Sequence, residues 1–169
     1  MPALLLAVTA VTMVLGMLGG APGPGTLPPL PQVDQSSLPL QTAEITVGGV
    51  PLTVELAYLP QDTTRGLGYR EGLAPGTGML FLHEGPAPRS FWMRGMQFCI
   101  DIVWIENGVI QGAAESVCPE PAGTADADLT SYVSPVPVTY VLEVPAGWLN
   151  AYGLGVGTPV VGLPSLVRQ

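Results

Sequence analysis

Lysine is missing from this sequence. Its five basic residues are all arginines, and they stand against 13 acidic residues for a formal net charge of −8. Nucleic acids are bound through clusters of basic side chains, so we expect no nucleic-acid partner. Charged residues of both signs make up only 11% of the chain, while 22 glycines and 19 prolines supply turns. That balance favours a mainly β fold.

Histidine is almost as scarce as lysine. His83 is the single histidine, so a zinc centre or a Ser-His-Asp hydrolase has little support, and we expect no metal and no cofactor. Met79, Met93 and Met96 carry sulfur, but methionines among apolar neighbours usually fill the core. The sequence shows no nucleophile with a base beside it, which makes an enzyme the least favoured class of protein.

The longest apolar run lies at the start of the chain. Residues 3–18 carry no charge, and they precede a segment rich in proline and glycine. We predict a signal peptide or membrane anchor over residues 1–20, an extended linker over residues 21–41 and one β-rich globular domain over residues 42–169. The protein is then exported to the cell envelope or beyond. It is anchored to the cytoplasmic membrane if residues 3–18 are retained.

Alternating apolar residues and turn signals place the elements of the domain. Val50–Ala57 alternates and follows a Gly48-Gly49 turn, which indicates a hairpin, and Asp62 can cap a short helix. We expect a mainly β fold, with a small distorted barrel-like sheet and one or two short helices. The expected strands are 45–47, 50–57, 78–82, 98–105, 109–116, 139–144 and 160–163, the expected helices are 63–69 and 148–154, and a proline loop is expected over 85–89.

The strand over Phe98–Ile105 is apolar on both faces, which is typical of a central strand covered on both sides. The Asn107-Gly108 pair after it is the strongest short signal for a two-residue hairpin turn. Residues 109–116 then return as the partner strand. A regular ladder from this turn sets Trp104 opposite Gln111.

Cys99 and Cys118 are the two cysteines. In the same register Cys99 lies opposite Ser116, and the diagonal to Cys118 is slightly too long for a disulfide in a regular ladder. A bulge near Gly112 would bring the two sulfur atoms together. Because an exported chain with an even number of cysteines favours the bond, we predict a Cys99–Cys118 disulfide. The alternative is two reduced thiols packed as small apolar groups.

Asp101 is an isolated acid within this apolar strand, so it must be paired, hydrogen-bonded or protonated. Arg70 and Arg94 are the candidate partners. One interpretation is a structural ion pair that fixes the strand register. The other is the polar floor of a ligand pocket. The walls of that pocket would be Phe91, Trp92 and Met93.

Short motifs follow one another along the domain. They are T-R-G-L at 64–67, Arg70 with Leu73, G-M-L-F at 78–81, F-W-M-R at 91–94, I-D-I at 100–102, and V-L-E at 141–143 with Ala146-Gly147. In order and spacing they resemble the family catalogued as domain of unknown function 192, over about residues 53–163. The resemblance implies a small β-rich fold and carries no activity. Members of that family commonly have methionine at the position of Gly68, asparagine and threonine at Gly95 and Met96, and proline at Cys99.

Three classes of function are compatible with these residues. A binding module for a small molecule or an envelope component leads, because an aromatic wall and an acidic floor can be recognised. A protein-interaction or accessory domain is second, and exposure of Trp92 or Tyr152 would support it. An enzyme with Asp101 as its acid or base is third, and it needs a second titrating group within reach. The candidate binding residues are Arg70, Trp92, Met93, Arg94 and Asp101.

Overall fold

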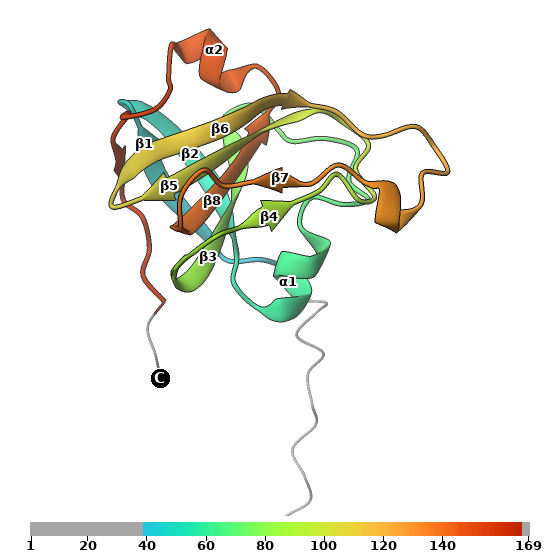
Figure 1. Ribbon diagram of the computed structural model, residues 1–169. Helices are drawn as coiled ribbons and strands as arrows, with labels where there is room; N and C mark the ends of the chain where they lie inside the picture. Colours follow the sequence, from blue (N-terminus) through green and yellow to red (C-terminus); the bar gives the residue numbers. More distant parts are fainter. Residues whose placement is uncertain (1–38, 167–169) are drawn as a thin grey trace, which may run out of the picture. The chain divides into compact units, whose positions relative to one another are not determined.

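The computed structural model describes residues 39–166, which form one curled β-sheet with two short helices (Figure 1). Its seven strands follow the order β6-β5-β8-β3-β2-β1-β9. β2 and β3 run parallel, and every other neighbouring pair is antiparallel. The strands are β1 (Thr42–Val47), β2 (Val50–Ala57), β3 (Thr77–Ala87), β5 (Ile100–Glu106), β6 (Val109–Val117), β8 (Val138–Pro145) and β9 (Val160–Val161).

Smaller elements surround the sheet. A two-stranded ribbon pairs β4 (Ser90–Phe91) with β7 (Tyr132–Val133). The helices are α1 (Pro60–Arg65), α2 (Trp148–Tyr152) and a 3₁₀ turn (Asp126–Asp128). The predicted signal or anchor segment lies outside the described residues, as does most of the predicted linker. Between residues 39 and 166, no helix is long and apolar enough to cross a membrane.

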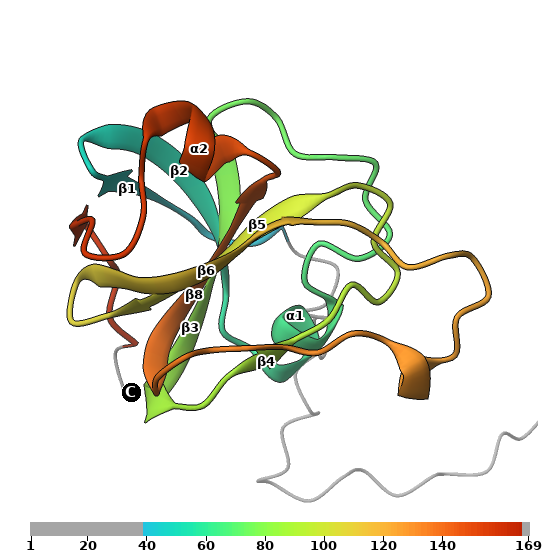
Figure 2. The same ribbon diagram turned by 45° about the horizontal axis from the view of Figure 1, so that its top comes forward.

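The two edge strands of the sheet come together where the β5–β6 turn meets the segment before β9 (Figures 1 and 2). Val109 forms an isolated bridge with Pro159. Beside it, the Val160 N–H donates to the Gly108 carbonyl at 2.7 Å. The sheet therefore curls back towards itself, and the prediction of a mainly β fold with a barrel-like sheet is confirmed.

The central strands are buried on both faces. Inside the curl, one apolar cluster takes side chains from all seven strands, among them Val54, Leu80 and Val160. A second cluster covers the outer face and includes Phe81 and Ile102. Because β5 is buried at all but its last residue, the predicted central strand is confirmed. Phe91 and Tyr132 of the β4–β7 ribbon pack against this outer cluster, and Leu67, in the segment after α1, is part of it.

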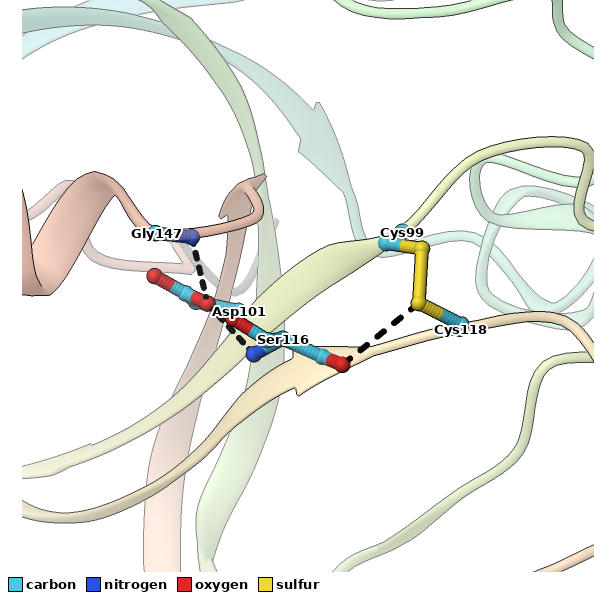
Figure 3. Close-up of a disulfide and its surroundings, with 5 residues drawn as sticks. All are labelled: Cys99, Asp101, Ser116, Cys118 and Gly147. Atoms are coloured by element: carbon cyan, nitrogen blue, oxygen red, sulfur yellow. Dashed lines mark hydrogen bonds between the residues drawn. A yellow bond between two sulfur atoms is a disulfide. The ribbon is translucent and has the colours of Figure 1, made fainter.

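The β5–β6 hairpin keeps the predicted register next to its turn and departs from it further along. Trp104 pairs with Gly112 rather than with Gln111, because β6 carries an extra residue at a bulge. A second shift follows nearer the ends of the two strands. Together the shifts bring Cys99 beside Cys118, with Cα atoms 4.1 Å apart, and the two cysteines form the predicted disulfide (Figure 3).

Helix α1 begins earlier than predicted. Its first residue is Pro60, whose fixed φ and missing N–H suit the first helical position. The helix ends at Arg65, and Gly66, with a φ of 51°, follows the helix rather than interrupting it. The predicted helix over 63–69, capped by Asp62, was therefore wrong at both ends.

Strand β3 is longer than predicted, because it continues through the expected proline loop to Ala87. Pro86 has no N–H to donate, but β2 pairs with β3 only as far as Phe81, so no donor is needed on that side. Helix α2 begins at Trp148, as predicted, but it ends at Tyr152 rather than at residue 154. Gly153 follows it and takes a left-handed conformation.

Candidate functional site

A cavity of about 540 Å³ lies on the outer face of the sheet, between α1 and the chain that runs from the end of β3 past β4. Figure 2 shows α1 beside β4, the two elements that flank this cavity. Its floor comes from neighbouring strands, because Phe81 and His83 of β3 and Glu143 of β8 share one face of the sheet. The other lining residues are Thr63, Thr64, Arg65, Gly66, Leu67, Gly68, Pro88, Arg89, Ser90, Phe91, Trp92, Arg94 and Met96.

The walls of the cavity are tied to each other and to its floor. Phe81 and Phe91 meet edge to face, with ring centroids 4.9 Å apart. The Tyr69 N–H donates to the Gly95 carbonyl at 2.8 Å and so joins the segment after α1 to the loop after β4. A Cβ on Gly68 would lie 2.9 Å from the Arg65 carbonyl oxygen, so glycine permits this close approach. The cavity is thus held open by packed elements.

Glu143 is the acid on the cavity floor. Its side chain is 5% exposed, and its Oε2 atom has no hydrogen-bond partner among the described residues. Burial raises the pKa of Glu143 from 4.5 to about 8, although the positive charge of Arg70 opposes the shift. At neutral pH this carboxyl group therefore keeps its proton and can donate a hydrogen bond into the cavity.

His83 adds a second buried polar group without a partner. Its Nε2 atom is buried and makes no hydrogen bond to any described residue. Burial and, to a smaller extent, the nearby positive charge of Arg89 together lower the pKa of His83 to about 4. The imidazole is therefore neutral at neutral pH, so neither titrating group on the floor carries a charge there.

Three arginines bring positive charge to this cavity: Arg65, Arg89 and Arg94. Arg89 is held by backbone carbonyls, since its Nε donates to Val138 at 3.3 Å and its Nη2 donates to Gly85 at 2.7 Å. Arg94 pairs with Asp126 at 2.8 Å, and both side chains are at least half exposed. Neither Arg65 nor Arg89 forms an ion pair with any described acid.

The candidate residues from the sequence fall in different places. Trp92 lines the cavity and is 53% exposed, and Arg94 lines it as well. Met93 is buried in the outer apolar cluster. Arg70 lies outside the cavity and forms a two-pronged ion pair with Glu55.

Asp101 pairs with neither arginine, so both predicted pairings were wrong. Its Oδ1 accepts hydrogen bonds from the N–H groups of Ser116 at 2.8 Å and Gly147 at 3.0 Å (Figure 3). Its Oδ2 accepts one from the Leu149 N–H at 3.1 Å. The carboxylate is fully buried and does not line the cavity beside Trp92, so it ties the start of α2 to the bulged end of β6. The same burial gives no support to Asp101 as an acid or base.

Glu143 is a cavity residue that was not predicted from the sequence. The sequence did carry a signal for it. Glu143 shares one face of a buried strand with the apolar residue Val141, just as Asp101 shares one face of its strand with Val103. His83 and Arg89 were also missed as site residues, since nothing in their local sequence distinguishes them from ordinary loop positions. These three side chains meet only through the pairing of β3 with β8 and the return of the chain after β3.

Comparison with known proteins gives a family and no activity. The model of the domain of unknown function 192 family, described as "Uncharacterized ACR", matches residues 43–162. The crystal structure of a proposed transcription regulator from Sinorhizobium meliloti is 30% identical, with a TM-score of 0.67 over 75% of this chain and 97% of that one. A protein of unknown function from Novosphingobium aromaticivorans is 28% identical, with a TM-score of 0.64 over 80% and 98%. No curated protein matches the chain.

Proposed function

This chain belongs to the domain of unknown function 192 family, whose description names no activity, and we propose that its domain is an exported module that binds a small organic molecule in the cavity beside Trp92. The observation that carries the proposal is Glu143, a buried acid on the floor of that cavity whose Oε2 atom has no hydrogen-bond partner among residues 39–166. An apolar side chain at this position would avoid the cost of burying a carboxyl group. A bound molecule that accepts a hydrogen bond from Glu143 would offset that cost.

The rest of the lining suits a ligand of modest size. Pockets of several hundred cubic ångströms with apolar walls and a few polar groups are typical of small-molecule sites. Here Phe81 is the apolar part of the floor, Phe91 and Met96 are apolar walls, and Trp92 stands at an exposed position. His83 supplies a second polar atom, Nε2, that has no partner in the part of the chain that the structure describes. These features support binding, whereas no described nucleophile lies beside a base in the cavity.

Export is part of the same proposal. The Cys99–Cys118 disulfide is consistent with an oxidising compartment. The apolar run at residues 3–18 supports secretion, with the domain in the cell envelope and the run kept as an anchor if it is not cleaved. In this arrangement the binding domain meets its ligand outside the cytoplasmic membrane.

Tryptophan emission and thermal melting provide the test. Trp92 is exposed, whereas Trp104 and Trp148 are 4% and 8% exposed, so a molecule in the cavity should change mainly the Trp92 signal. We expect members of a collection of small organic fragments to shift that emission and to raise the melting temperature. A ligand present at 100 times its Kd stabilises the folded state by about 2.7 kcal/mol. If no fragment changes either signal, the proposal fails.

A pair of matched variants assigns any binding to the cavity. Glu143→Leu removes the polar floor and should weaken binding by about tenfold or more, the cost of one lost hydrogen bond to a buried group. Glu115→Leu makes the same change at an exposed position of β6 outside the cavity and should bind as the wild-type protein does. Equal affinity of both variants would place the ligand elsewhere on the surface.

A further inference from the structure

The positive charges of this acidic domain gather at one place. Four arginines and no lysine lie among residues 39–166, and three of the four line the cavity. The fourth, Arg70, is held in an ion pair with Glu55. Arg94 is paired with Asp126, so Arg65 and Arg89 are the two arginines among residues 39–166 that no described acid neutralises, in a chain whose net charge is −8.

The positive charge of Arg89 is not neutralised by an ion pair with any described acid. Two backbone carbonyls fix its guanidinium group, but they leave N–H donors of the group free, and no described carboxylate lies within ion-pair distance. The side chain is also partly buried. A fixed, partly desolvated guanidinium without an anionic partner is suited to bind one from outside, since its geometry matches the two oxygens of a carboxylate or phosphate.

We infer that the molecule bound in this cavity is a small organic oxyanion, with an apolar body against the aromatic walls and a carboxylate or phosphate head at Arg89. The inference rests on the proposed binding function and names the chemical class of the ligand. Phe81, Phe91 and Met96 contact the body of the ligand, and Trp92 covers it. Arg65, which makes no ion pair with a described acid, attracts the head to the mouth of the cavity.

The acid on the floor does not oppose an anion. Glu143 would repel an oxyanion if it were ionised, but its burial keeps it protonated at neutral pH, so it donates a hydrogen bond instead. The charged and titrating groups around it are His83, which is neutral, and the arginines of the cavity together with Arg70. Glu143 is the only acid among the described residues that line the cavity, and in its protonated form it can donate a hydrogen bond to a bound anion.

Three probes with one apolar body test the class of ligand: 3-phenylpropanol, 3-phenylpropionate and 2-phenylethyl phosphate. Each is titrated into the purified full-length protein while Trp92 emission is followed. We expect at least one oxyanion to bind about tenfold more tightly than the alcohol, as one charge-assisted hydrogen-bonded pair allows. The tighter of the two oxyanions identifies the head group. Equal affinity for all three probes overturns the oxyanion inference and leaves the binding function standing, whereas no response to any probe counts against both.

Variants assign the preference to the arginines. Arg89→Gln and Arg65→Gln should each reduce the preference for the oxyanion over the alcohol, and their melting temperatures show whether they remain folded. Arg65 is exposed and makes no described ion pair, so its replacement tests the inference even if Arg89→Gln fails to fold. Asn150→Asp, on α2, changes the net charge by the same amount away from the cavity and should keep the full preference. An unchanged preference in Arg65→Gln and Arg89→Gln overturns the assignment.

Collisional quenching measures the local charge without any organic ligand. A protein of this net charge repels iodide and attracts caesium over most of its surface. Beside the arginines the order should reverse, so at constant ionic strength we expect the ratio of iodide to caesium quenching to be higher for Trp92 than for the free, uncharged reference compound N-acetyltryptophanamide. Arg65→Gln should weaken the quenching by iodide, and Asn150→Asp should not. A ratio for Trp92 at or below that of N-acetyltryptophanamide overturns the inference.

Discussion

Replacement of Asp101 by alanine should weaken the whole domain, although this residue lies away from the cavity. Its carboxylate accepts hydrogen bonds from the N–H groups of Ser116, Gly147 and Leu149. Alanine leaves all three donors without their acceptor. The Leu149 bond is fully buried, while the other two are partly buried and admit water more easily.

The size of the effect follows from these three bonds. An unsatisfied buried donor costs about 1–3 kcal/mol, with the higher values for deeply buried groups. With Leu149 near the middle of that range and the two partly buried groups near its lower end, Asp101→Ala should lose about 4 kcal/mol. Asp101→Asn keeps one acceptor oxygen for Ser116 and Gly147 and loses the bond to Leu149, so it should lose about 2 kcal/mol. Small domains are stable by only about 5–15 kcal/mol, so either loss is readily measured.

Urea unfolding with the disulfide intact, followed by circular dichroism, measures the loss. For a slope near 2 kcal/mol per molar urea, Asp101→Ala should lower the midpoint by about 2 M. Glu115→Gln is the control, because it removes an exposed carboxylate from the same hairpin and should change stability by about 0.5 kcal/mol or less. Hydrogen exchange at Gly147 and Leu149 should also quicken more than exchange in β3.

The order of the three variants is the decisive outcome. If the free energies of unfolding of Asp101→Ala and Glu115→Gln differ by less than about 1 kcal/mol, the Asp101 carboxylate does not hold α2 in place and the prediction is refuted. If Asp101→Asn costs as much as Asp101→Ala, the negative charge of the carboxylate matters more than the number of its hydrogen bonds. That result would contradict the assumption that each hydrogen bond to Asp101 contributes separately to stability.

Three further predictions concern the disulfide and Glu143. Replacing Cys99 and Cys118 together by alanine should lower the free energy of unfolding by about 3 kcal/mol, because the bond closes a loop between residues 19 apart, and a much smaller loss in urea melts would contradict this. The folded-state pKa of Glu143 is raised above its unfolded value, so its contribution to stability is full below pH 4.5 and is lost as the pH rises to about 8. Glu143→Gln removes this titration. In unfolding curves taken across that range, the free energy of unfolding of the variant should therefore rise relative to that of the wild-type protein as the pH rises, and a constant difference would count against the burial of the acid. Ionisation of Glu143 should also weaken binding of 3-phenylpropionate by about tenfold between pH 7 and pH 9, whereas the affinity of Glu143→Gln should stay level in the same titration.

Local patterns predicted those parts of the fold that depend on neighbours in the chain. The Gly48-Gly49 turn, the covered strand β5 and the start of the short helix α2 all appear where the sequence placed them. The start of α1 and the length of β3 were wrong. Pro60 begins the helix instead of preceding it, and β3 extends because β8 pairs with it again at Ala87, a contact that no local pattern contains.

The disulfide was predicted from the sequence, but its geometry depends on contacts that the sequence did not predict. Composition and an even number of cysteines favoured the bond, but a regular ladder from the turn placed the two sulfur atoms too far apart. Two register shifts in β6 close the gap between Cys99 and Cys118. The sequence allowed a bulge near Gly112 without requiring it, since the extra residue is accommodated only once the rest of the sheet sets how β5 and β6 twist.

By itself, the sequence determined that an acid within a covered strand needs partners and that few positive charges were available to supply them. Only the tertiary structure decided which acid faces the cavity. Asp101 turns to backbone amides that lie 15 to 48 residues away along the chain, and Glu143 turns to the outer face beside the arginines. The alternation of side chains shows which residues share a face of a strand. Whether that face becomes the inside of the curl or the wall of a cavity depends on the order of strands far apart in sequence, which local patterns do not carry.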